Sequence, residues 1–136
     1  DRLQACFSAA PPGAMRIAVM HHAPVPAADG TPADMARFPA VLAALADAGA
    51  DLVLSGHTHM PHAGFAETAA GVLFLQAGTA ISTRLKTDTN DFALIEIGPA
   101  AVTQHAWLAP RGEAFTAAPP ARFLKTAMRW QRVVQA

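Results

Sequence analysis

Two short apolar runs, separated by one amphipathic segment, constrain the fold of this 136-residue chain more than any other feature. Residues 17–20 (IAVM) and 52–54 (LVL) are apolar throughout, which is typical of strands buried on both faces of a parallel sheet. Between them, apolar side chains recur at helical spacing: Phe38, Val41, Leu42 and Leu45. The spacing predicts a helix over about residues 39–48, and the whole pattern predicts a parallel βαβ unit.

Local signals agree with this helix. Asp34 is a candidate N-cap, Pro39 fits only a first turn, and Gly49 is placed to cap the C-terminus. The opening residues, 1–10, also have a helical pattern, which ends at a Pro-Pro-Gly break. Because the chain starts inside such a pattern and without a Met, we expect it to be a piece of a longer protein.

The second half of the chain has a different pattern, with short apolar segments and close turns. Four strands are predicted, at residues 63–68, 71–78, 91–98 and 101–109. Their close spacing favours an antiparallel meander, and the polar stretch 79–90 is predicted to be a loop. The tail, residues 119–130, is predicted to form a short helix with four inward side chains: Phe123, Leu124, Ala127 and Met128.

Composition excludes several classes of protein. The chain is 52% hydrophobic and carries no formal net charge, so we expect one globular domain over residues 1–136 and no nucleic-acid polymer as partner. No apolar run reaches about 18 residues, so we expect no membrane association and a cytoplasmic location. The single cysteine, Cys6, excludes an internal disulfide and a Cys-based zinc site, and we expect an inert core residue there.

Histidines follow both of the predicted parallel strands. His21 and His22 come directly after the first strand, and His57, His59 and His62 come after the second. Ligands in open α/β sheets bind outside the carboxyl ends of parallel strands. If these two strands are neighbours, their histidines therefore reach the same edge of the sheet.

The segment Gly56-His-Thr-His is suited to metal binding. Histidines at i and i+2 of an extended segment lie on the same side, and Gly56 lets backbone and metal approach closely. Neutral imidazole suits Zn, Mn and Fe. The alternative is a set of surface histidines, and this is the interpretation that we prefer for His62 and for His105, which lies in an alternating strand.

Two motifs resemble the calcineurin-like metallophosphoesterases. Residues 51–61 (DLVLSGHTHMP) resemble the last motif of that family, and residues 17–26 (IAVMHHAPVP) resemble the motif before it. The second motif, together with residues 75–85 (LQAGTAISTRL), resembles in particular the branch of class III cyclic-nucleotide phosphodiesterases, although Ala23 replaces a proline that is common there. The resemblance implies the C-terminal half of a four-layer αββα sandwich, with a mixed sheet and an antiparallel meander.

The resemblance also implies a function and a role for each residue. The complete protein would hydrolyse phosphate mono- or diesters, cyclic nucleotides among them, with two divalent metal ions: Mn, Fe or Zn. His21 and His57 would bind one metal and His59 the other. His22, Gly56 and Thr58 would support these ligands or face the substrate.

Three motifs of that family do not occur in this chain: Asp-x-His, Gly-Asp-x-x-Asp and Gly-Asn-His followed by Asp or Glu. Asp29, Asp34 and Asp51 lie in no such context, so we expect the chain alone to be inactive and to need its N-terminal half, or a second copy of itself in a homo-oligomer. Two alternatives remain open. One is a non-catalytic interaction scaffold on the same fold, and the other is a small protein with a single metal site.

Overall fold

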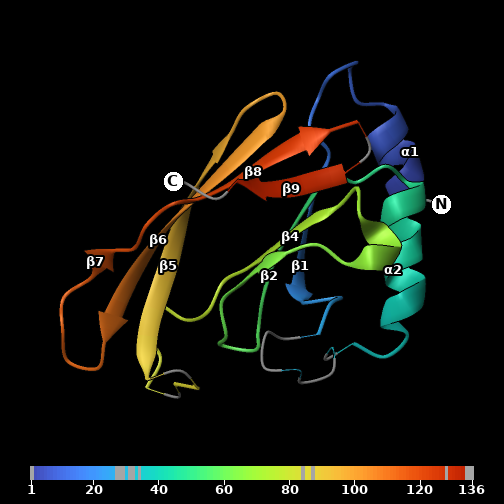
Figure 1. Ribbon diagram of the computed structural model, residues 1–136. Helices are drawn as coiled ribbons and strands as arrows, with labels where there is room; N and C mark the ends of the chain where they lie inside the picture. Colours follow the sequence, from blue (N-terminus) through green and yellow to red (C-terminus); the bar gives the residue numbers. More distant parts are fainter. Residues whose placement is uncertain are drawn as a thin grey trace.

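Helices, a mixed sheet and an antiparallel sheet form three successive layers in the computed structural model of the chain (Figure 1). The structure describes residues 2–26, 30, 33, 35–83, 85–86, 88–127 and 129–133. The elements are α1 (Arg2–Ser8), β1 (Ile17–His22), α2 (Phe38–Asp47), β2 (Leu52–Gly56), β3 (His62–Gly64), the 3-10 helix η1 (Glu67–Ala69), β4 (Leu73–Gln76), β5 (Thr89–Ile97), β6 (Ala101–Pro110), β7 (Thr116–Ala117), β8 (Ala121–Thr126) and β9 (Arg129–Val133). None of the helices in the described part of the chain is long and apolar enough to cross a membrane.

The mixed sheet contains the predicted βαβ unit. Its strand order is β1-β2-β4-β3; β1 and β4 are both parallel to β2, and β3 is antiparallel to β4. Helix α2 begins at Phe38 with Pro39 in its first turn, and Gly49 follows it with a φ of 74°, as the predicted cap requires. The residue that caps its N-terminus is Arg37, in the left-handed region, whereas the predicted cap, Asp34, lies outside the described residues.

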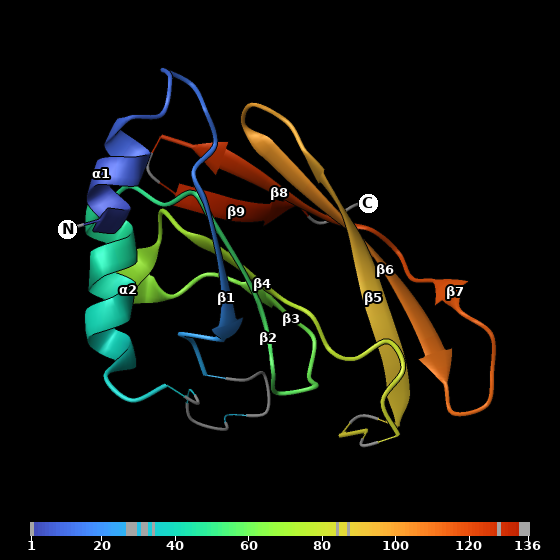
Figure 2. The same cartoon turned by 180° about the vertical axis from the view of Figure 1, so that it is seen from behind.

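The central strands β2 and β4 are buried on both faces, as predicted for residues 52–54. The same prediction is wrong for residues 17–20, because β1 is an edge strand and Val19 is 78% exposed. On one face Val53 and Phe74 pack beneath α1 and α2, which lie together on this side of the sheet (Figures 1 and 2). On the other face Leu52 and Leu73 pack against Phe123 and the other inward residues of the second sheet. This two-sided burial fixes the register of β2, because a slip of one residue would exchange the two sets of side chains.

The antiparallel sheet is a meander in the order β5-β6-β8-β9, with β7 paired to β6. The predicted meander is confirmed, and the predicted strands 91–98 and 101–109 correspond to β5 and β6, but the other two predicted strands do not belong to it. Residues 71–78 contribute β4 to the mixed sheet, parallel to β2, and the predicted strand 63–68 is instead the end of β3 followed by η1. The wrong assignment arose because short apolar segments do not reveal which sheet they join.

The predicted helix in the tail is wrong. Residues 121–126 and 129–133 form the antiparallel strands β8 and β9, in which Phe123 and Trp130 are 0% and 2% exposed and fill the space between the sheets. Their spacing also suits a helix, and burial against Leu52 and Leu73 decides in favour of strands. Met128 lies outside the described residues. The prediction of a core position for Cys6 is also wrong, because Cys6 is exposed on α1, which has no buried residue.

Asp51, directly before β2, ties the two sheets together. Its carboxylate accepts a hydrogen bond from the backbone N–H of Arg16 at 2.7 Å and forms an ion pair with Lys125 of β8. Its backbone carbonyl accepts a hydrogen bond from Nε1 of Trp130 at 3.0 Å. Asp51 therefore holds the end of the mixed sheet that is opposite to the histidines and is not part of their site.

Candidate metal centre

A shift of register near the end of β1 places two consecutive histidines at one site. Val19 of β1 pairs with Leu54 of β2, and the next paired residue along β1 is His22, which faces Gly56. Over this interval β1 therefore contains one residue more than β2. Consecutive side chains of a regular strand point to opposite faces, and an extra residue of this kind re-aims them. His21 and His22 consequently both lie beside the turn that follows β2.

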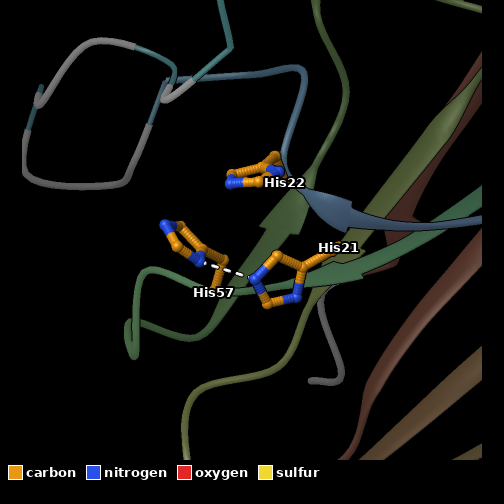
Figure 3. A group of neighbouring side chains, drawn as sticks. All are labelled: His21, His22 and His57. Carbon is orange, nitrogen blue, oxygen red and sulfur yellow. Dashed lines mark hydrogen bonds between the residues drawn. The ribbon is translucent and has the colours of Figure 1, made fainter.

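The imidazoles of His21, His22 and His57 gather at this edge of the sheet (Figure 3). Each offers a ring nitrogen, and these atoms all lie within 4.8 Å of one another. Nδ1 of His57 and Nε2 of His21 are hydrogen-bonded at 2.7 Å, and the ring centroids of the three pairs are 4.3–4.7 Å apart. His21 and His57 are exposed and His22 is half-buried, so the group is open to solvent.

The turn after β2 aims His57 at the end of β1. His57 has a φ of 75°, which is uncommon for a residue with a side chain, and the N–H of Thr58 donates to the carbonyl of Gly56 at 3.0 Å. Such strained backbone persists where its surroundings hold it, and it concentrates at functional sites.

Gln76, at the end of β4, stabilises the turn that follows β2 through side-chain hydrogen bonds. It is 1% exposed, and its Nε2 donates to Oγ1 of Thr58 and, at 2.8 Å, to the carbonyl of Met60. Thr58, predicted to support the ligands or face the substrate, is thus bonded to the supporting glutamine. Gln76 was not among the residues predicted from the sequence. The available signal was a polar residue at the end of the apolar run 72–75, next to a strand that ends in histidines.

The other histidines lie apart from this group. His59 follows in the same turn with a φ of 59°, but among the described residues it does not belong to the cluster of three. His62 begins β3 and pairs with Gln76, and burial lowers the pKa of its imidazole. His105 lies on β6, with Nε2 at 3.1 Å from a carboxylate oxygen of Glu96. The role of His59 as a ligand therefore stays a prediction.

A second support lies between β4 and β5. The carboxylate of Asp91 accepts hydrogen bonds from the N–H groups of Gly78 and Thr79, at 2.9 and 3.3 Å. Burial raises the pKa of Asp91, and the two backbone hydrogen bonds oppose that shift. The residue before Gly78 is also hydrogen-bonded to β2, because the N–H of Ala77 donates to the carbonyl of Ser55 at 2.9 Å. Asp91 thus fixes the loop beside Gly56, and it too was missed from the sequence.

The donor set fits a metal ion. Imidazole is the usual nitrogen ligand of Zn, Fe, Cu and Ni, and three convergent imidazoles match the ligand number of open catalytic zinc sites. Within the described part of the chain no carboxylate joins this cluster, so its residues bring no negative charge. The arrangement can hold one cation with positions left for water or a substrate oxygen.

The layers and the sheet topology define the class of fold, which is that of the metallophosphoesterase sandwich. Among solved structures, this chain is similar to Vps29 from Cryptosporidium parvum: the identity is 24%, the match covers 69% of this chain, and the TM-score is 0.50. It is also similar to Vps29 from Chaetomium thermophilum, with 13% identity, coverage of 68% and a TM-score of 0.51. This chain spans 47% and 51% of those two structures, about half of their length.

A third structure is a conserved Streptococcus pneumoniae protein described as a predicted phosphoesterase. It is 20% identical over 65% of this chain and 48% of its own, and its TM-score of 0.46 is too low to establish a shared fold. No protein-family model and no curated protein matches the sequence. Vps29 belongs to the calcineurin-like metallophosphoesterase superfamily, so the predicted fold class is confirmed. The narrower resemblance to cyclic-nucleotide phosphodiesterases stays a prediction.

Proposed function

We propose that this chain is the C-terminal portion of a metal-dependent phosphoesterase and that it carries the histidine ligands of a two-metal site. The observation that carries the proposal is the contact between His21 and His57. These residues end adjacent parallel strands, and their ring nitrogens are 2.7 Å apart. Ligands bind at this edge of α/β sheets, and neutral imidazoles so close together are suited to a shared cation.

The chain's own residues would bind and orient the cations. His21 and His57 would hold one metal and His59 the other, with Mn, Fe and Zn as candidates. When bound, a pair of divalent ions lowers the pKa of a water and offsets the charge of a phosphoryl group. Gly56 leaves room for close approach, and Gln76 keeps the turn that presents His57. The substrates would be phosphate mono- or diesters, including cyclic nucleotides.

The proposed site needs carboxylates from elsewhere. Two dications about 3.5–4 Å apart repel each other strongly, and bridging carboxylates normally offset this repulsion. The clustered imidazoles are neutral ligands and cannot do so. An N-terminal half of the same domain, or a second copy of the chain, would supply the missing groups, and the 136-residue chain alone would be inactive.

The test combines sequence and activity. The reading frame upstream of Asp1 should encode Asp-x-His, Gly-Asp-x-x-Asp and Gly-Asn-His in that order, and the longer protein should hydrolyse bis(p-nitrophenyl) phosphate with Mn²⁺. His21→Ala and His57→Ala should abolish this activity in the longer protein, whereas His105→Ala should retain it. Metal-dependent hydrolysis by the 136-residue chain alone, or full activity of His57→Ala, would contradict the proposal.

A second candidate function is a non-catalytic interaction scaffold, favoured by the outward face of the antiparallel sheet. Phe92 and Trp107 pair across β5 and β6 with their rings stacked, 6.0 Å between centroids and 2° between planes. Phe92 is 41% exposed and the neighbouring Leu94 is 59% exposed. Exposed apolar patches of this kind mark protein interfaces. Sedimentation should show that the chain self-associates and that Leu94→Thr reduces this association. Ile81→Thr, in the segment between β4 and β5, is the control. An equal effect of Ile81→Thr would argue against the outward face of β5 and β6 as the interaction surface.

A further inference from the structure

We propose that His22 is a metal ligand and that His21, His22 and His57 bind one transition-metal ion within this chain. The inference shares the metal binding of the proposed function but does not depend on catalysis. The resemblance to metallophosphoesterases implies no such role for His22, because it assigns the metals to His21, His57 and His59. The structure gives His22 a different place from the one that a regular strand would give it.

The register shift is the first step of the argument. In a regular strand the side chain of His22 would point to the face opposite to that of His21, and the two residues could not bind the same metal ion. With one additional residue between Val19 and the end of β1, the rings of His21 and His22 meet edge to face, 4.7 Å between centroids. The ring of His22 also lies 4.3 Å from that of His57, the shortest of the three separations. Figure 3 shows the three rings around a common space.

The distances suit one ion after a small adjustment. Two nitrogens bound to a tetrahedral zinc ion at about 2.0–2.1 Å lie about 3.4 Å from each other. The hydrogen-bonded nitrogens of His21 and His57, now 2.7 Å apart, would therefore separate by about 0.7 Å. No separation among the three ligand nitrogens exceeds 4.8 Å. Rotation of the exposed or half-buried imidazoles about their χ angles would bring the nitrogens to the spacing of a bound ion.

The donors also predict which metals bind. Three neutral imidazoles without a carboxylate favour Zn²⁺, Co²⁺, Ni²⁺ and Cu²⁺, whereas Mg²⁺ and Mn²⁺ prefer oxygen ligands. A two-metal site completed by carboxylates would accept Mn²⁺ readily. The 136-residue chain by itself should therefore select Zn²⁺ or Co²⁺ over Mn²⁺, with a stoichiometry of one.

The role of His22 can be separated from that of His59 by calorimetry. Zn²⁺ titrated into the untagged chain should bind one ion per chain. His22→Ala and His22→Asn should each lower the affinity at least tenfold, since even partners outside the ligand shell change metal affinity by about 10–100-fold. His59→Ala should leave it within about threefold, and His105→Ala is the matched control for loss of a histidine elsewhere. The denaturation midpoint of each apo variant shows that it is folded.

Co²⁺ provides a readout that does not depend on affinity alone. The visible spectrum of the Co²⁺-loaded chain should have the intense bands of a four- or five-coordinate site, and His22→Asn should shift or weaken them. An unchanged spectrum and affinity in both His22 variants would overturn the inference. So would a loss of binding in His59→Ala that matches the loss in His21→Ala. Either result leaves the proposed function standing, because that function requires only His21, His57 and His59.

Discussion

Nε2 of Gln76 donates a hydrogen bond to the backbone carbonyl of Met60 at 2.8 Å. The same nitrogen bonds Oγ1 of Thr58, so a single buried amide at the end of β4 holds both sides of the turn that carries the histidines. Buried polar groups that lose their partner cost about 1–3 kcal/mol. The turn therefore depends on this side chain for its stability and for the direction of His57.

Gln76→Leu should lower the free energy of unfolding by about 1–3 kcal/mol, because it leaves the carbonyl of Met60 without its donor. It should also weaken Zn²⁺ binding, since His57 would no longer be held toward His21. Urea denaturation and calorimetry measure the two effects. Gln131→Leu, at an exposed position of β9, is the control and should change neither. Equal behaviour of the two variants would show that the turn does not need Gln76.

Gly78→Ala should destabilise the fold because an added Cβ would overlap the carboxylate of Asp91. That carboxylate accepts hydrogen bonds from the N–H groups of Gly78 and Thr79, so the clash would disrupt both of these hydrogen bonds. We expect a loss of about 1–3 kcal/mol in urea denaturation. The control is Gly98→Ala, where the nearest atom to the added Cβ, the carbonyl oxygen of Ala101, is 3.6 Å away. The free energy of unfolding of Gly98→Ala should stay within about 0.5 kcal/mol of that of the unchanged chain. A similar loss in both variants would show that the contact between Gly78 and Asp91 has no special role in stability.

His62 should make the chain sensitive to acid. Burial lowers the pKa of its imidazole below the ordinary value of about 6.5, so the unfolded chain binds a proton at a higher pH than the folded chain does. Between those two pKa values the unfolded state holds more protons, and the free energy of unfolding falls as the pH falls. Urea denaturation with a chelator present, from about pH 7.5 to about pH 5, should show this loss.

His62→Gln removes the titrating group and should reduce the fall in the free energy of unfolding between about pH 7.5 and about pH 5. The substitution should change the free energy of unfolding less at about pH 7.5 than at about pH 5. The comparison uses the difference between the two proteins at each pH, so contributions from other groups cancel. Parallel decline of the variant and the unchanged chain over this range would show that His62 does not titrate with folding.

Local patterns predicted the elements that position the site. The apolar runs before His21 and His57 identified two parallel strands, and their ends meet as the βαβ pattern implies. The helix between them, its terminal Gly49 and the position of the histidines at the carboxyl edge followed from the same reasoning. These features are encoded within short stretches of chain, where periodicity and capping residues are informative.

Features that depend on distant contacts were not predictable in this way. The register shift before His22 leaves no mark in residues 17–22 and is visible only when β1 is aligned with β2. The strand at Phe123 and the support from Gln76 depend likewise on neighbours far along the chain. Tertiary packing overrides local preference at such positions.

The most direct test of the metal site is an anomalous difference map from crystals of the chain grown with Zn²⁺, recorded at the zinc absorption edge. The account predicts that the strongest peak lies about 2.0–2.1 Å from a ring nitrogen of His21 and from one of His57. A map with zinc bound elsewhere, and no peak between these two imidazoles, would contradict it.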